Sequence, residues 1–171
     1  MARSRRAAGH PLSAGHEVAG ARPVAARTGF VDVAGRRIRH RVLGRGADAV
    51  VLVHGFGGRL ENWAANQAAL ASGGREVAAL DLPGHGESGA DVGSGSLDEL
   101  AASVLAYMDA VGIHRAHLVG HSMGAAACLV VADRLTDALD FFLGEGEFGQ
   151  DLSCGQRSGP GMVFLIAADV V

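Results

Sequence analysis

The sequence predicts an α/β fold with a mostly parallel central sheet and flanking helices. Three short apolar runs, at residues 49–53, 76–80 and 116–119, have the composition expected of strands buried on both faces. A segment with helical spacing of apolar residues follows each run, and the connections are short. Strands that alternate with helices in this way are typical of a parallel sheet.

An antiparallel pair of strands is expected before the parallel part. Phe30–Val33 and Ile38–Val42 alternate between apolar and polar residues, and a turn at Ala34–Gly35 joins them. Residues 1–27 are rich in Ala, Gly and Arg and lack apolar periodicity. They are expected to form a flexible N-terminal arm or linker, with a partial domain at 28–140.

Each of the three helices has local signals for its ends. A first helix is expected over Asn62–Ala71, stopped by the glycines that follow. Ser96 and Glu99 have the spacing of a capping box, so the second helix should begin at about Leu97 and stop at Gly112. The third is expected from Met123 to Leu135.

The pattern changes after about residue 140. Residues 141–171 are rich in glycine and aperiodic, with one possible strand at 162–167. The segment lacks the regular pattern of apolar residues found in the preceding domain. A frameshift, a truncated gene or a misassigned end would produce such a change. The α/β domain is therefore expected to be truncated after its third helix.

Composition excludes several function classes. The net charge is −3, too small to indicate nucleic acid or an anionic membrane surface as a partner. All 15 cationic residues are arginine, so the chain offers no lysine for a Schiff base, a phosphate loop or a prosthetic group. Two cysteines, Cys128 and Cys154, suit a reducing compartment. A soluble protein of the cytoplasm is expected, without membrane spans.

Neither a cofactor nor a metal is expected. Two segments, 84–89 and 144–149, match Gly-x-Gly-x-x-Gly. The first does not open a helix, and the second carries acids where a phosphate would sit, so both are interpreted as accidents of a glycine-rich chain. No cluster of His, Cys and carboxylates has metal-ligand spacing.

Ser122 is the candidate nucleophile. It is the centre of a Gly-His-Ser-Met-Gly run at 120–124, between a buried strand and an apolar helix. In that context a Gly-x-Ser-x-Gly turn strains the serine backbone and raises its hydroxyl above the strand end. The following amides, at a helix N-terminus, then face the position where negative charge develops.

A glycine-rich loop at 54–58 supplies the second half of the candidate site. The backbone amides of Phe56 and Met123 are predicted to form an oxyanion hole. The Phe56 side chain could instead line the pocket. His54 is interpreted as a structural residue of the loop in preference to a catalytic one.

These motifs resemble the α/β-hydrolase superfamily over about residues 28–135. The resemblance rests on the loop at 54–58 with Trp63, on Asp-Leu-Pro-Gly-His-Gly-Glu-Ser at 81–88, and on the turn around Ser122. Within the superfamily, the runs 51–58 and 116–124 look like the hydrolase-fold domain of acetoin dehydrogenase acyltransferase (E2) subunits. The resemblance implies hydrolysis or transfer of an acyl group from a small ester or thioester, with a multienzyme complex or a complementing chain as partner.

The resemblance also implies a catalytic acid and a histidine after the serine. The eight histidines are at 10, 16, 40, 54, 85, 114, 117 and 121, so none follows Ser122. Asp169 is a weak candidate for the acid. Activity of this chain is therefore expected to be impaired. The alternatives left open are a non-catalytic fragment or interaction module, and a half-domain completed by another chain.

Overall fold

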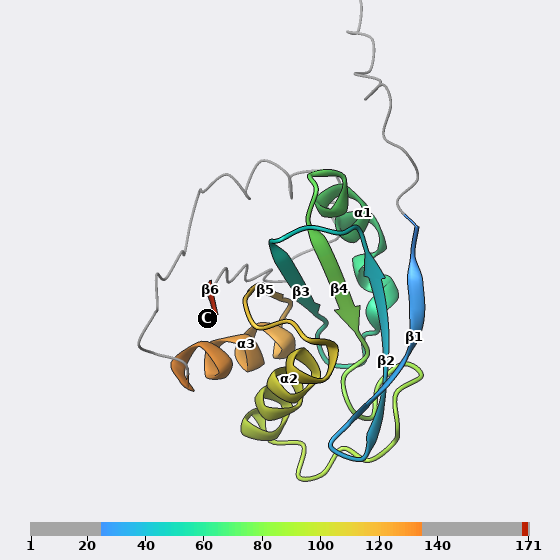
Figure 1. Cartoon of the computed structure of the whole chain (residues 1–171). Coiled ribbons are helices and arrows are strands. Elements are labelled where there is room, and N and C mark those ends of the chain that lie inside the picture. The colour runs from blue at the N-terminus through green and yellow to red at the C-terminus, as the bar shows by residue number, and fades with distance from the viewer. Residues whose placement is uncertain (1–24, 135–168, 171) are drawn as a thin grey trace, which may run out of the picture.

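The α/β fold is present as a mixed sheet with helices on both faces (Figure 1). The computed structural model describes residues 25–134 and the backbone of 169–170. Its strands are β1 (Arg27–Val33), β2 (Arg36–Leu43), β3 (Ala49–Val53), β4 (Glu76–Leu80), β5 (Ala116–Gly120) and β6 (Asp169–Val170). Its helices are η1 (Leu60–Trp63), α1 (Ala64–Ser72), α2 (Leu97–Val111) and α3 (Met123–Arg134).

The strand order is β1-β2-β4-β3-β5-β6, with a parallel centre. β3 pairs in parallel with β4 and with β5, whereas β1–β2, β2–β4 and β5–β6 are antiparallel. The predicted N-terminal hairpin and the parallel core are both confirmed. β1 begins at Arg27, one residue inside the segment expected to be the arm.

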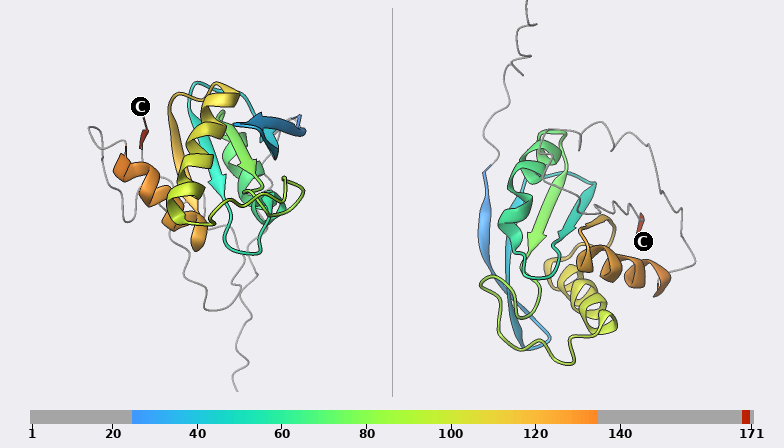
Figure 2. Two further views of the ribbon diagram at one scale, coloured as in Figure 1. Left: turned by 90° about the horizontal axis from the view of Figure 1, so that it is seen from below. Right: turned by 180° about the vertical axis from the view of Figure 1, so that it is seen from behind.

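The alternation of side chains along the strands builds a core on each face of the sheet. Val51 and Val53 pack with α2 and α3, while Val50 and Leu52 pack with η1 and α1. All five residues of β3 are buried, as expected for a strand covered on both faces. Figure 2 shows α1 on one side of the sheet and α2 with α3 on the other.

Three parallel strands therefore end at the same edge of the sheet. The loop 54–59 follows β3, the loop 81–96 follows β4, and Ser122 follows β5. Open α/β sheets bind their ligands at this carboxyl edge.

Several expectations from the sequence lie outside the described residues. They are most of the N-terminal arm, Cys154, and the possible strand at 162–167. Within the described part of the chain, no helix is long and apolar enough to cross a membrane.

Candidate active site

The turn that carries Ser122 is strained. Ser122 has a φ of +51°, one of two positive values among the described residues other than glycine. Such a conformation costs about 1–3 kcal/mol and is held only by its surroundings. The turn is fixed because His121 N–H donates to Val53 O at 3.0 Å and Gly124 N–H donates to His121 O at 2.9 Å. The serine side chain remains exposed at the surface.

Close packing against β3 explains why a glycine, Gly124, stands two positions after the serine. A side chain on Gly124 would overlap the carbonyl oxygens of Val53 and His54. The helix α3 can therefore start directly beside the end of β3 only with glycine at this position.

The loop after β3 lies against the serine turn. A Cβ added to Gly55 would be 2.8 Å from His121 Nδ1 and 3.2 Å from Ser122 Cβ. Gly58 N–H closes a turn on Gly55 O at 3.0 Å. Among the described residues, the hydrogen bonds of the loop and the serine turn do not use the amides of Phe56 and Met123 as donors.

His54 is held in a structural role. Its Nδ1 lies 2.7 Å from Gly55 O, and its Nε2 accepts a hydrogen bond from Leu82 N–H at 3.0 Å. The side chain is 1% exposed. Burial lowers the pKa of His54, which favours the neutral ring that can accept from Leu82. Both ring nitrogens are therefore engaged within the loops.

Phe56 points its side chain outward. The ring is 85% exposed and meets the edge of the His85 ring, with 5.9 Å between the ring centroids. His85 in turn lies 5.1 Å from His54, and its Nδ1 is 3.0 Å from Pro83 O. The loops after β3 and β4 thus meet beside the serine turn, with an aromatic side chain available to a substrate.

A buried carboxylate that the sequence analysis did not single out joins these two loops. Asp81 is fully buried, and it accepts hydrogen bonds from Leu60 N–H at 2.6 Å and from Glu87 N–H at 2.9 Å. Arg39, on β2, lies 3.5 Å from it. The position of Asp81, directly after a buried strand, could have indicated this role in the sequence. A carboxylate that is buried at such a position needs hydrogen-bond donors or a cation as partners.

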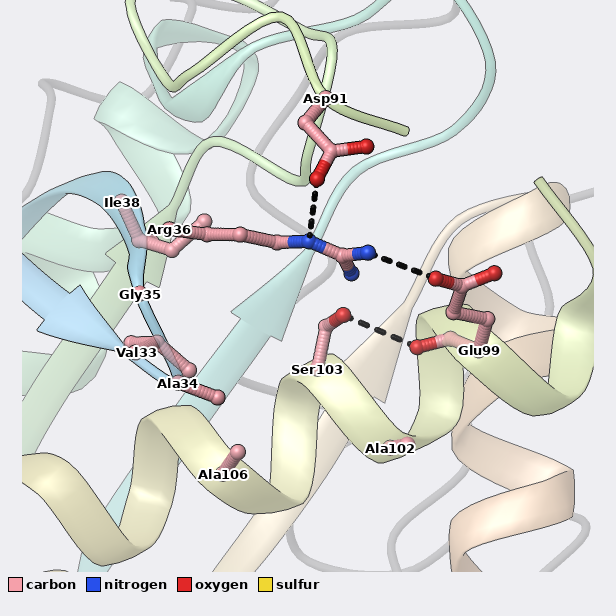
Figure 3. A pocket seen from close by; sticks show the side chains of 10 residues that line it. All are labelled: Val33, Ala34, Gly35, Arg36, Ile38, Asp91, Glu99, Ala102, Ser103 and Ala106. Atoms are coloured by element: carbon pink, nitrogen blue, oxygen red, sulfur yellow. Dashed lines mark hydrogen bonds and ion pairs between the residues drawn. The ribbon is translucent and has the colours of Figure 1, made fainter. Parts of the chain in front are cut away.

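A hollow of about 410 Å³ lies elsewhere, between the β1–β2 turn and α2 (Figure 3). Its charged lining is Arg36, which pairs with Asp91 at 3.2 Å and with Glu99 at 2.7 Å. Hydrogen bonds from Ser94, together with Arg36, lower the pKa of Glu99 to about 2. The residues that line the hollow do not include the serine turn or the loop after β3, so it is separate from the candidate site.

The structure does not support Asp169 as the catalytic acid. Its backbone pairs with His117, near the start of β5, whereas Ser122 follows the other end of that strand. In an extended strand, the distance from His117 to Ser122 is about 15 Å. Among the described residues, no group of His, Cys, Asp and Glu could hold a metal ion.

Comparison with known proteins identifies the family. The family model described as alpha/beta hydrolase fold matches residues 48–140, from the start of β3 to beyond α3. The chain belongs to the alpha/beta hydrolase fold family. The match includes the loop after β3, the loop after β4 and the serine turn.

Curated relatives in this family have two kinds of name. The dihydrolipoyllysine-residue acetyltransferase component of the acetoin cleaving system of Pseudomonas putida is 55% identical over 102 residues, which is 59% of this chain and 27% of that protein. A 2-hydroxy-6-oxononadienedioate/2-hydroxy-6-oxononatrienedioate hydrolase of Burkholderia vietnamiensis is 42% identical over 100 residues, covering 56% of this chain and 35% of that protein. The chain thus spans about a third or less of these relatives.

Solved structures agree with this assignment. A predicted CIB-like hydrolase of Thermoplasma acidophilum matches with a TM-score of 0.63 and 25% identity, over 67% of this chain and 59% of that one. The α/β-hydrolase fold and the resemblance to acyltransferase components are therefore confirmed.

Proposed function

We propose that this chain provides the serine nucleophile and oxyanion hole for hydrolysis or transfer of an acyl group from an ester or thioester. The observation that carries the proposal is the strained backbone of Ser122, at φ +51°, packed against Gly55 of the loop after β3. Backbone strain at an exposed serine, between a buried strand and a helix and beside a glycine-rich loop, favours a functional turn.

The proposed reaction begins with attack of Ser122 Oγ on the acyl carbonyl. The serine proton leaves to a base as the new C–O bond forms. The amides of Phe56 and Met123 donate to the developing oxyanion, which collapses with expulsion of the alcohol or thiol. Water or another acceptor then takes the acyl group from the serine.

Turnover by this sequence is proposed to be impaired. The sequence has no histidine after Ser122, and the described His54 is fully engaged with Gly55 and Leu82. A serine hydroxyl without a base is a weak nucleophile at neutral pH. An added small base should replace part of the missing function, because the Ser122 side chain is exposed.

Labelling with a fluorophosphonate tests this proposal. We expect slow labelling that imidazole accelerates by at least about tenfold, by analogy with the usual gain from general-base catalysis. Ser122→Ala should remove the label with and without imidazole. Labelling that persists in Ser122→Ala would refute the nucleophile, and rapid labelling without imidazole would refute the impairment.

A thioester is the favoured substrate class. The Pseudomonas putida relative is named as a dihydrolipoyllysine-residue acetyltransferase component, and the Phe56 ring is available for an apolar chain. The residues given include no lysine, so a lipoyl group would be presented to Ser122 from outside this segment. The cytoplasmic location stays a prediction.

A second candidate is a non-catalytic module derived from such an acyltransferase. The acetoin-cleaving components among the relatives and the missing histidine favour it. Absence of Ser122-dependent labelling, even with imidazole, would select this alternative.

A further inference from the structure

One buried carboxylate holds the two loops at the candidate site. Asp81 Oδ1 accepts from Leu60 N–H at 2.6 Å, where the loop after β3 enters η1. Asp81 Oδ2 accepts from Glu87 N–H at 2.9 Å, in the loop after β4. The Asp81 side chain has no solvent exposure. Its charge is thus compensated by protein groups alone.

Arg39 is the cation beside this carboxylate. Its Nη1 lies 3.5 Å from Asp81 Oδ2 and 3.2 Å from Glu87 Oε1, and its Nη2 lies 2.9 Å from Glu61 Oε1. The side chain is 14% exposed. One guanidinium therefore contacts one carboxylate at the end of β4, one in the loop after β4 and one in η1, a geometry that the planar fork of arginine permits.

The backbone of Arg39 fixes this guanidinium in register with the loops. Arg39 N–H donates to Ser88 Oγ at 2.9 Å, and Asp81 N–H donates to Arg39 O at 2.9 Å. Ser88 Oγ donates to Asp81 O at 2.7 Å. Arg39 therefore contacts the loop after β4 with its backbone, through Ser88, and with its side chain, through Glu87.

The Phe56 amide lies between two points that this network secures. His54 Nε2 accepts from Leu82 N–H, the residue after Asp81, on one side of Phe56. Leu60 N–H is held by Asp81 itself on the other side. A shift of Asp81 would move both points relative to Gly55, which packs on Ser122 Cβ.

We propose that Arg39 is a positioning residue of the acyl-transfer site. It holds the charge of Asp81 in place and thereby keeps the Phe56 amide opposite Ser122. The inference rests on the proposed function, since the oxyanion hole has value only if Ser122 is acylated. Arg39 does not itself contact the substrate or the reacting atoms.

Arg36 provides a matched control on the same strand. It also pairs with two carboxylates, Asp91 and Glu99, but in the hollow beside α2, apart from the serine turn. Arg36→Gln therefore removes an arginine with two acidic partners, one of them in the distal part of the loop after β4, and leaves the hydrogen bonds of Asp81 to Leu60 and Glu87 untouched. Arg39→Lys restores a cation without the planar fork.

Two measurements test the inference on Arg39→Gln, Arg39→Lys and Arg36→Gln. The first is the rate of fluorophosphonate labelling in imidazole, with urea unfolding to confirm that each variant is folded. The second is hydrogen exchange of the Leu60 and Glu87 amides. We expect Arg39→Gln to slow labelling by about tenfold or more and to accelerate both exchanges, with partial recovery in Arg39→Lys and parental behaviour in Arg36→Gln.

The two readouts separate this inference from the proposed function. Equal labelling rates in folded Arg39→Gln and Arg36→Gln would overturn the positioning role, even if exchange accelerates. Unchanged exchange in Arg39→Gln would overturn it too. If the parent protein takes no label, the proposed function fails. Accelerated exchange of the Leu60 and Glu87 amides in Arg39→Gln would then still show that Arg39 holds these two amides in place.

Discussion

At the scale of single residues, the serine turn depends on a backbone contact that tolerates no side chain. Gly124 sits directly on the carbonyl oxygens of Val53 and His54. These atoms belong to β3 and to the loop that approaches Ser122, so they cannot move without disturbing the site. The requirement for glycine follows from this approach and applies whether or not the serine reacts.

Gly124→Ala is expected to lower the free energy of unfolding by about 2–3 kcal/mol, because the added methyl forces backbone apart. Urea unfolding measures this. Gly29→Ala is the control, since a Cβ there would meet His40 Nε2 at 3.9 Å, an ordinary contact, and should change stability by less than about 0.5 kcal/mol. Equal losses in the two variants would contradict the assigned contact.

Among the residues of the site, the sequence predicts those whose signal is local. Ser122 and the loop at 54–58 stand out because glycines and strand ends surround them. The pairing of Arg39 with Asp81 has no local signal, because the two residues are 42 positions apart. They meet only through the antiparallel register of β2 on β4, in which His40 pairs with Leu80, and no local pattern specifies that pairing.

At the scale of elements, the ends of α2 were predicted well because they have short-range chemical causes, whereas the helix start predicted at Asn62 falls within η1, and α1 begins at Ala64. α2 begins at Leu97 and ends at Val111, followed by the C-cap residue Gly112, whose φ of +74° is left-handed. The capping box at its start is only half present. Ser96 Oγ accepts from Glu99 N–H at 3.2 Å, but Glu99 bonds Ser94 N–H and Arg36 instead of the Ser96 amide. Arg36 arrives from β2, so the sequence around α2 could not reveal it.

Ser96→Ala is expected to destabilise the protein by about 1 kcal/mol, the usual cost of losing an N-cap oxygen. Urea unfolding is the measurement, with circular dichroism to follow the helix. Ser72→Ala removes an exposed hydroxyl that donates to Ala69 O at the end of α1, and it should cost less than about 0.5 kcal/mol. An unchanged free energy of unfolding in Ser96→Ala would show that Glu99 and Ser94 alone fix the start of the helix.

At the scale of the whole molecule, the three parallel strands bring the candidate site to one edge. The boundaries of the core strands agree with the sequence because each is a short buried run between polar segments. The backbone pairing of β6 with β5 was not predicted, since Asp169–Val170 has no strand pattern of its own. The chain corresponds to about a third or less of the two curated relatives compared above.

Global stability should fall as the pH drops from about 7.5 to 5.5. Burial lowers the pKa of both His40 and His54 below the ordinary 6.5. The unfolded chain then binds more protons than the folded chain in the window below 6.5, so protonation favours unfolding there. Carboxylates with lowered pKa values, such as Glu61 and Glu99, act at lower pH.

Urea unfolding at the two pH values measures this dependence. His40→Gln should reduce it, because His40, whose Nδ1 lies 2.9 Å from Tyr107 Oη, contributes part of the effect. A stability that is flat over this range, or one that rises on acidification, would contradict the lowered pKa values of the half-buried His40 and the buried His54.

The central claim is that Ser122 accepts an acyl group. The most direct measurement is peptide mapping by mass spectrometry after incubation with p-nitrophenyl acetate and imidazole. We predict one acetyl group per chain, located on Ser122, together with an equal amount of p-nitrophenolate released in excess of that from imidazole alone, and neither the acetylation nor the excess in Ser122→Ala. Acetyl groups on other residues only, or release of p-nitrophenolate that Ser122→Ala retains in full, would contradict the account.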